Sequence, residues 1–571
     1  MIELSVEESM SYMRRRISCF SITLAALSIS ISSTAAAFAH NTVGDFVKYF
    51  NPLPQKNYLN ESQDRRITKG KFKAADSTSV ATAQNPEQGI FAILPPDKFT
   101  QAELADRLLS DQRVAGLSVL VPWKPFEPTE EKYNWADLDA LLALCQKHNK
   151  TVILRVSTCG VDLPADGAKD KIASDTPEWV FANGAKSVKY NDKNKTAHLM
   201  PVFWDQTYLA AFSNFIGELG SRYDKNILMQ SVGITGGGFS GGTSILPTSL
   251  ESKNVAKDEN NETGFNSAEA LDNYLRKDHA LTQKKIVDHW KYVADIFPQA
   301  FPNTRLNFAI NPTTPNRAGE DALDEISDYL VFRYGEHIYI TRQNIEDGRH
   351  SFDDYRVQLK FRADTYAGVE LAPSFSPVDL SRLSKAALDD GISFVEIPVE
   401  LLDNQDATVK QSLEKLAHHL GYHLVSQTAK IPAELMQGDQ LKADFSFLNI
   451  GDTSPKRPVR ELDKDVASSY KVMIELKDSS GKMVAKILHT PSKKTELWKS
   501  GENISWQQSL KMPELAPGEY EASASIYDPN SDKKLNIIDA RETGKQVAGV
   551  DLALGKLRIV APSSASKTLS N

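Results

Sequence analysis

Aromatic rings and a glutamate are concentrated in one short connection of this chain. The connection separates an apolar run fit for a buried strand from a run with apolar residues at helical spacing, and it carries Trp123, Phe126, Glu127, Tyr133 and Trp135. So many flat rings suit stacking against the faces of sugars. For Tyr133 and Trp135 the alternative is that they only cap the packing of a barrel. The residue types predict a saccharide contact on one strand–loop–helix unit.

The same stretch resembles the second βα unit of the (β/α)8 glycoside hydrolases of the large retaining clan, especially bacterial β-galactosidase-like barrels. The loop of that family carries a tryptophan, then Glu-Pro, then Tyr-x-Trp and soon afterwards an Asp. The matching residues here are Trp123, Glu127-Pro128, Tyr133-Asn134-Trp135, and Asp137 or Asp139. The resemblance implies a barrel fold and a carbohydrate substrate. It does not by itself imply an active enzyme, because one fold serves many functions.

Eight βα repeats are predicted between residues 86 and 420, where short apolar β-rich runs alternate with helical patterns. The predicted strands are Gly89 to Leu94, Val114 to Val121, Thr151 to Ser157, Leu228 to Thr235, Arg305 to Ile310, His337 to Thr341, Gly368 to Pro373 and Ser393 to Val399. The helices between them include Thr100 to Ser110, Trp135 to Lys147, Gln206 to Tyr223, Thr282 to Phe297, Asp321 to Tyr334 and Asp379 to Asp389. We therefore predict an α/β fold, a (β/α)8 TIM barrel followed by an all-β sandwich domain.

The sandwich domain is predicted over residues 421–562, where turn residues break up short alternating runs. Its strands include Leu441 to Leu448, Tyr470 to Leu476, Trp506 to Leu510 and Tyr520 to Tyr527. Trp498 and Trp506 are interpreted as core residues, and a carbohydrate-binding face is the alternative. The resemblance to bacterial glycosidase-like barrels with a C-terminal β-sandwich covers most of the chain after residue 85. Residues 563–571 have the composition of a disordered tail.

Residues 1–39 have the organisation of a secretory signal peptide. Arg14-Arg15-Arg16 precedes an apolar segment, Ile17 to Ser33, and Ala37-Phe38-Ala39 forms a cleavage site. We expect export to the periplasm or the medium, with no stable membrane anchor after cleavage. A transmembrane anchor is the alternative, and a lipid anchor at Cys19 is another. Residues 40–85 are polar without sustained periodicity, so we expect a flexible lead-in.

The charge, the cysteines and the glycine motif argue against a nucleic-acid partner, a disulfide, a transition metal and a cofactor. The net charge is −8 and no basic stripe is present, so nucleic acid is not expected as a partner. Cys145 and Cys159 are predicted a full strand length apart, which is too far for a disulfide. Since no Cys or His cluster has metal-site spacing, we expect no transition metal. The glycine-rich run at residues 236–242 lacks a phosphate-loop ending and a dinucleotide fingerprint, so no cofactor is expected.

Barrels of this kind bind their ligands at the carboxyl ends of the strands. Polar residues predicted at those ends are Arg155, Ser157, Thr235, Asn311, Gln343, Glu370, Glu396 and Glu400. Trp179 and Trp204 lie in long loops at the same end, where they either form a sugar platform or pack on the barrel. We predict that substrate is bound by Trp123, Arg155, Trp179, Trp204, Asn311, Gln343 and Glu396. For Arg155 and Glu396 the alternative is a buried ion pair.

Retaining hydrolysis of a glycoside needs two carboxyl groups about 5 Å apart. The resemblance implies that Glu370, on the seventh strand, is the nucleophile. The second carboxyl group is missing from its usual place after the fourth strand, which here reads Gly233 to Gly238. Asp162, Glu178 and Asp205 are substitutes, although residues of this kind are more often helix caps or solvated loop charges. Asp205, directly before a helix, is well placed as an N-cap.

Two functions of different classes are therefore predicted. The leading hypothesis is an exported glycoside hydrolase-like protein that acts on an oligo- or polysaccharide, with a retaining mechanism if active and Glu370 as its catalytic residue. The alternative is a non-catalytic saccharide-binding protein on the same scaffold, serving polysaccharide export or assembly. A scaffolding protein of the cell envelope is a third hypothesis, which no sequence motif supports. A second carboxyl oxygen within about 5 to 10 Å of Glu370 across an open pocket separates the first two.

Overall fold

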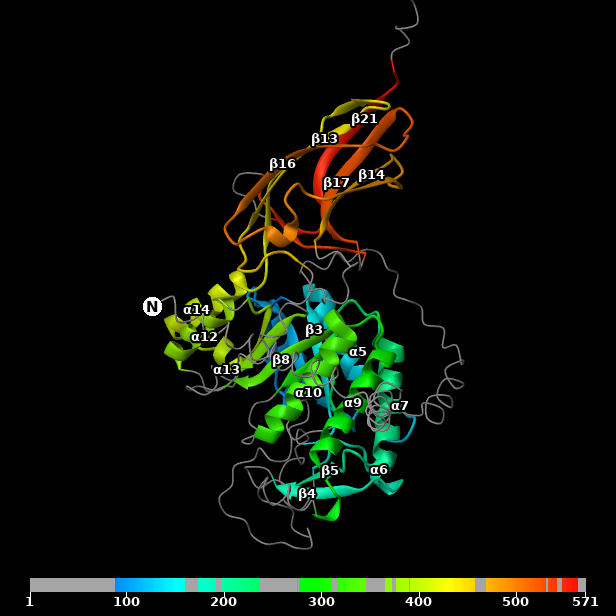
Figure 1. Cartoon of the computed structure of the whole chain (residues 1–571), viewed down its shortest axis with the longest axis vertical. Coiled ribbons are helices and arrows are strands. Elements are labelled where there is room, and N and C mark those ends of the chain that lie inside the picture. The colour runs from blue at the N-terminus through cyan, green and yellow to red at the C-terminus, as the bar shows by residue number, and fades with distance from the viewer. Residues whose placement is uncertain are drawn as a thin grey trace, which may run out of the picture. The chain divides into compact units, whose positions relative to one another are not determined.

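The structure is a computed structural model, shown in Figure 1. It describes residues 88–159, 173–191, 197–236, 275, 277–310, 317–345, 365–371, 376–389, 391–456, 469–529, 532–541 and 547–562. Several predictions lie outside the described residues: the signal peptide at 1–39, the lead-in at 40–85, the tail at 563–571, Asp162 and Asn311.

A closed parallel barrel forms the first part of the described chain. Its strands are β1 (Gly89–Leu94), β2 (Val114–Pro122), β3 (Thr151–Ser157), β6 (Met229–Gly233), β7 (Leu306–Ile310), β8 (Ile338–Ile345), β9 (Ala367–Leu371) and β10 (Phe394–Pro398). Strands that follow one another in the barrel sequence are also neighbours around the ring, and β10 closes it against β1. Each strand matches one of the eight predicted runs to within a few residues. The TIM-barrel prediction is confirmed.

Helices follow the strands around the barrel (Figure 1). They are α4 (Ala102–Ser110), α5 (Ala136–His148), α6 (Glu178–Ala182), α7 (Gln206–Tyr223), α9 (Gln283–Ala300), α10 (Arg317–Tyr334), α12 (Pro377–Asp389), α13 (Val399–Leu402) and α14 (Ala407–His419), with the short 3₁₀ helices η1 (Pro96–Lys98) and η3 (Gly335–His337). Between β3 and α7 the chain also forms an antiparallel hairpin of β4 (Ser187–Asn191) and β5 (Ala197–Pro201). The sequence patterns did not predict this hairpin.

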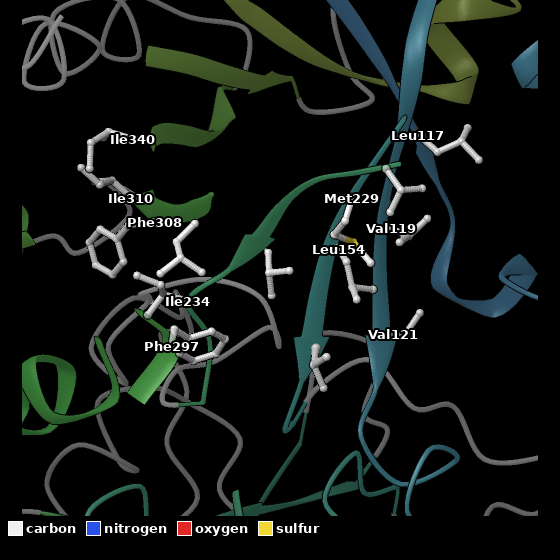
Figure 2. Packing of buried hydrophobic residues seen from close by; sticks show 14 of the residues in the cluster. Leu117, Val119, Val121, Leu154, Met229, Ile234, Phe297, Phe308, Ile310 and Ile340 are labelled. Atoms are coloured by element: carbon white, nitrogen blue, oxygen red, sulfur yellow. The ribbon is translucent and has the colours of Figure 1, made fainter. Parts of the chain in front are cut away.

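The outer face of the barrel is apolar because every second residue of each strand points toward the helices. Leu117 and Val119 of β2, Leu154 of β3 and Phe308 of β7 belong to one continuous core with helix residues such as Phe297. Figure 2 shows part of this core. Because this outer face is buried, its positions are almost all Val, Ile, Leu or Phe, and that pattern made the strands predictable from the sequence.

The inside of the barrel is layered. One layer is a separate aromatic and apolar cluster made of Phe91, Ala115, Ile153, Tyr339, Tyr366 and Phe394. Further toward the carboxyl ends of the strands, the inward positions become polar and are buried: Ser118, Arg155, Asn307, Thr341 and Glu396. The apolar layer excludes water from one side of the polar layer, and the candidate site is built on the polar layer.

The C-terminal part consists of two sheets that share one core, as expected for a sandwich. One sheet has the order β16-β13-β11-β19-β20 and the other the order β12-β21-β17-β14-β15, with β18 paired to β17. The strands are β11 (Leu424–Lys430), β12 (Glu434–Met436), β13 (Leu441–Asn449), β14 (Lys471–Lys477), β15 (Met483–His489), β16 (Asn503–Leu510), β17 (Gly518–Asp528), β18 (Lys533–Lys534), β19 (Ile537–Asp539), β20 (Val547–Gly549) and β21 (Leu552–Val560).

The tryptophans of the C-terminal part are core residues, as interpreted from the sequence. Trp498 is fully buried, and the ring of Trp506 packs against Phe445 and Phe447 inside the shared core. The indole N–H of Trp506 donates a hydrogen bond to Nε2 of His489 at 2.9 Å. Neither ring presents an open face to a sugar.

Cys145 and Cys159 are both buried, and no disulfide joins them in the described part of the chain. Burial raises the pKa of the Cys145 thiol to about 12. Among the described residues, His, Cys, Asp and Glu side chains form no group that could hold a metal ion. No helix in the described ranges is both long enough and apolar enough to cross a membrane.

Asp205 caps α7, as the sequence predicted. Its carboxylate accepts hydrogen bonds from the backbone N–H groups of Thr207 at 3.0 Å and Tyr208 at 3.2 Å. Asp205→Ala is expected to lower the free energy of unfolding by about 1 kcal/mol, because two helix N–H groups lose their acceptor. Asp205→Asn is the matched control and should cost much less, since Asn also accepts at this position. Urea unfolding measures both variants, and equal losses would contradict the capping role.

Candidate functional site

A buried ion pair between Arg155 and Glu396 forms the centre of the polar layer. Arg155 comes from β3 and Glu396 from β10, and their side chains are 3% and 0% exposed. The guanidinium donates in a bidentate manner, with Nη1 2.5 Å from Oε2 and Nη2 2.7 Å from Oε1. The pair therefore crosses the inside of the barrel and confirms the alternative that the sequence offered for these residues. Both were also predicted substrate ligands, and in the structure the two Nη atoms of Arg155 and the two carboxylate oxygens of Glu396 engage each other.

Neutral polar side chains complete the network around the pair. Ser118 on β2 donates a hydrogen bond to Glu396 and accepts one from Nη1 of Arg155 at 3.0 Å. Nη2 of Arg155 also lies 3.3 Å from Oδ1 of Asn307 on β7, and Nδ2 of Asn307 donates to Oγ1 of Thr341 at 2.7 Å. Five strands thus contribute to one buried network. Sequence reasoning missed Ser118, Asn307 and Thr341, although their inward position follows from strand alternation.

The glycine at the end of the fourth strand makes room for Arg155. A Cβ at Gly233 would lie 2.5 Å from Cγ of Arg155, well inside van der Waals contact. Here the space is taken by the stem of the arginine, which reaches across the barrel to Glu396.

Glu370 lies beside this network, at the carboxyl end of β9. It is the register partner of Glu396 on the adjacent parallel strand, so the two side chains share the inner face of the barrel. Glu370 is half-buried, whereas Glu396 is fully buried. Burial acts to lower the pKa of Arg155, but the charges of Glu396 and Glu370 act in the opposite direction and the pKa is raised. Glu370 is therefore a partly accessible carboxylate at the edge of a buried positive charge.

Of the predicted substitutes for the second carboxylate, Asp162 lies outside the described residues, and Glu178 and Asp205 have other partners. Glu178 is exposed and pairs with Lys124 at 2.7 Å, and Asp205 caps α7. Thr235 and Gly236, which follow β6, are not carboxylates.

Asp175 is a buried carboxylate that the sequence reasoning missed. It accepts a hydrogen bond from Ser157 at the carboxyl end of β3, so it lies at the same end of the barrel as Glu370.

Trp123 is a core residue, which corrects its predicted role as a sugar contact. Its side chain is fully buried, and its ring packs against Phe212 and Phe215 of α7 and against the edge of Trp179. No face of the indole is open to a ligand. The prediction went wrong because the covering rings come from a helix about 90 residues later in the sequence.

The other predicted aromatic and polar ligands have different placements. Trp179 and Trp204 are half-buried, and Nε1 of Trp179 donates to the backbone oxygen of Glu127 at 3.0 Å. The Lys285 ammonium lies 5.9 Å from the ring centre of Trp204. Gln343 lies on β8, as expected, and its side chain is outside the described residues. The structure thus leaves the roles of Trp179, Trp204 and Gln343 as predictions.

Glu127 of the Glu-Pro motif is a buried carboxyl group with a raised pKa. Burial raises it to about 7, although hydrogen bonds from the N–H of Glu131 at 2.9 Å and from Nε1 of Trp123 at 3.0 Å favour the charged form. A raised pKa means that the folded protein binds this proton more tightly than the unfolded chain does, so protonation of Glu127 stabilises the fold. This contribution is fully present below about pH 4.5 and is lost as pH rises through 7.

Glu127→Gln is therefore expected to flatten the pH dependence of stability between about pH 4.5 and 7. The wild-type free energy of unfolding should fall more steeply across this interval than that of the variant. Denaturant unfolding at a series of pH values measures the two slopes. Glu130→Gln removes an exposed carboxylate whose charge contributes least to the raised pKa of Glu127, so its slope should stay close to that of the wild type. Parallel curves for wild type and Glu127→Gln would contradict the assignment.

Comparisons with known proteins identify no family, and a solved structure is similar to part of the chain. No protein-family model matches the chain, and no curated protein matches it. Among solved structures, the chain is similar to the catalytic domain of β-amylase from Paenibacillus polymyxa, with a TM-score of 0.40 and 10% identity. That match covers 54% of this chain and 92% of the other. A likeness of this size carries no argument about activity, and the barrel is established by its own strand order.

Proposed function

We propose that this chain is a glycoside hydrolase-like protein that acts on an oligo- or polysaccharide, with Glu370 as the nucleophile. The observation that supports this most is the position of Glu370. It is a half-buried carboxylate at the carboxyl end of a barrel strand, beside the guanidinium of Arg155. Active sites of TIM-barrel enzymes lie at this end. A fixed positive charge next to the carboxylate stabilises the anion that would attack an anomeric carbon.

The retaining mechanism assigns separate tasks to the residues of the site. Glu370 would form a glycosyl ester as the bond to the leaving oxygen breaks, and water would then hydrolyse the ester. Arg155, fixed by Glu396, would hold Glu370 in one orientation. Protonation of the leaving oxygen requires a second carboxyl group, for which Asp175 joins the candidates because it lies at the same end of the barrel.

A non-catalytic saccharide-binding protein is the second candidate function, and one observation favours it. Within the described residues, the carboxylate nearest to Glu370 in the strand register is Glu396, which Arg155 and Ser118 already engage. Such a carboxylate is poorly suited to proton transfer. In this alternative, Glu370 accepts hydrogen bonds from sugar hydroxyl groups and no bond is broken.

The two functions are separated by turnover of a substrate panel. Purified protein and Glu370→Gln would be incubated with aryl glycosides and with bacterial and plant polysaccharides, and the anomer first released would be followed by NMR. Hydrolysis with retention by the wild type, together with saccharide binding but no turnover by the variant, is expected for the hydrolase. Saccharide binding without turnover by either protein would reject the hydrolase and favour the binding protein.

We also propose that the protein is exported, on the basis of the signal-peptide organisation of residues 1–39. Expression of the whole chain in a bacterial host, followed by N-terminal sequencing of the periplasmic and medium fractions, tests this. The expected mature N-terminus is His40. Full-length protein that stays with the membrane fraction would instead support an uncleaved anchor.

A further inference from the structure

A small cavity lies at the carboxyl ends of β1 and β2. Its volume is about 140 Å³, and residues of η1, β2, the following loop and the start of α5 line it. Val121, one of the lining residues, belongs to the outer core of the barrel, so the cavity lies outside the ring of strands. With about 30 Å³ for each water molecule in the liquid, it has room for roughly five waters or for one six-membered ring.

The walls of this rim cavity, as we call it, combine apolar rings with polar groups. The half-buried ring of Phe99 is the accessible aromatic part of the wall, and the buried ring of Phe126 supports it edge to face with ring centres 6.1 Å apart. Asp97, Asn134 and Asp137 are exposed polar residues of its lining. Flat apolar surface together with a few hydrogen-bonding groups is the composition that binds sugars, whose rings have apolar faces and polar edges.

Two carboxylates of the rim cavity are available to a ligand. Within the part of the chain that the structure describes, the side chains of Asp97 and Asp137 have no hydrogen-bond or ion-pair partner. Ionised carboxylates accept hydrogen bonds and cannot donate them, so an occupant must bring hydroxyl or ammonium donors. An acidic occupant would meet two like charges, and no lysine or arginine is among the residues that line the cavity.

We propose that the rim cavity is an accessory subsite for one non-acidic sugar residue, neutral or amino-substituted, of a saccharide whose other end reaches the barrel mouth. The identification of the ligand as a saccharide rests on the proposed function. The subsite itself does not depend on hydrolysis, because it requires only that a sugar chain cross the β1–β2 side of the barrel. It selects against uronic acids and sulfated sugars.

The test uses the turnover-deficient Glu370→Gln chain, so that binding is measured without hydrolysis. Isothermal titration with cellohexaose, with the hexamer of glucosamine and with hexagalacturonate compares neutral, amino and acidic sugars. Adding Asp137→Asn, which weakens a charge-assisted hydrogen bond, or Phe99→Ala, which removes an apolar contact, is expected to weaken binding of the tighter non-acidic hexamer on the order of tenfold. Hexagalacturonate should bind more weakly than either non-acidic hexamer.

Two further variants keep the result interpretable. Glu103→Gln removes an exposed charge from α4, outside the cavity lining, and should leave binding unchanged. Asp97 lies in the short η1 segment, and Asp97→Asn should also weaken saccharide binding. This variant keeps the test valid if the substitution at Asp137 in α5 or at Phe99 disturbs folding. Thermal unfolding of each variant monitors folding. Saccharide binding that is equal in all variants would overturn the subsite and leave the proposed function standing. Failure of every hexamer to bind the parent chain would overturn the subsite, whereas turnover of the wider substrate panel decides the proposed function separately.

Discussion

Glu370→Gln is expected to lower kcat for a hydrolysed glycoside by on the order of 10⁴-fold, while saccharide affinity changes by about twofold at most. The amide has nearly the shape of the carboxylate and keeps one acceptor oxygen, so ground-state contacts survive. It is not a nucleophile for an anomeric carbon, so the first chemical step stops. Steady-state kinetics on the best glycoside of the panel, with binding by titration, gives both quantities.

Glu400→Gln is the matched control for this substitution. Glu400 is an exposed glutamate on α13, a short helix that directly follows β10, and it was also among the polar residues predicted at the strand ends. Its variant should keep wild-type kcat. A Glu370→Gln protein that retains most of its turnover would remove Glu370 from the chemistry, and an equal loss in both variants would point to a general effect on folding.

Glu396→Gln is expected to lower the free energy of unfolding by about 3 to 5 kcal/mol, because it leaves the guanidinium of Arg155 buried without its main counter-charge. Both charged groups are almost fully buried, and the pair has two short hydrogen bonds of 2.5 and 2.7 Å. Activity should fall as well, since Arg155 would no longer be fixed beside Glu370. Chemical denaturation measures the stability.

An exposed ion pair of similar geometry provides the control. Arg107 and Asp403 are joined by two hydrogen bonds of 2.6 and 3.0 Å, and their side chains are about half exposed. Asp403→Asn should cost less than about 1 kcal/mol, because water solvates the charge that remains. The double variant Arg155→Met with Glu396→Leu should recover much of the stability lost in Glu396→Gln. Similar costs for Glu396→Gln and Asp403→Asn would contradict the structural role of the buried pair.

The strands and most helices were predictable from the sequence because burial on the outer face of the barrel imposes a strong pattern. In β3, for example, Val152, Leu154 and Val156 alternate toward the helices, and turn residues and helical periodicity mark where the strand stops. The β4–β5 hairpin was missed because its short strands, with Lys189 and His198 among their residues, lack that apolar pattern.

The site was less predictable because it depends on contacts between strands that are distant in the sequence. Arg155 and Glu396 stood out as charges within apolar strands, so their pairing could be offered as an alternative. Ser118 and Asn307 gave no such signal, since small polar residues also occur on exposed strands. Trp123 was misassigned because nothing in its own loop reveals the rings of α7 that cover it.

The most direct test of the central claim is covalent trapping at Glu370. A 2-deoxy-2-fluoroglycosyl fluoride of the best sugar in the panel loses fluoride without needing a proton, so the trap requires only the nucleophile and does not depend on the acid. Mass spectrometry of the treated protein is expected to show the added mass of one fluorosugar residue, located by peptide mapping on Glu370. Sugar binding with no adduct, or an adduct on another residue, would contradict the account.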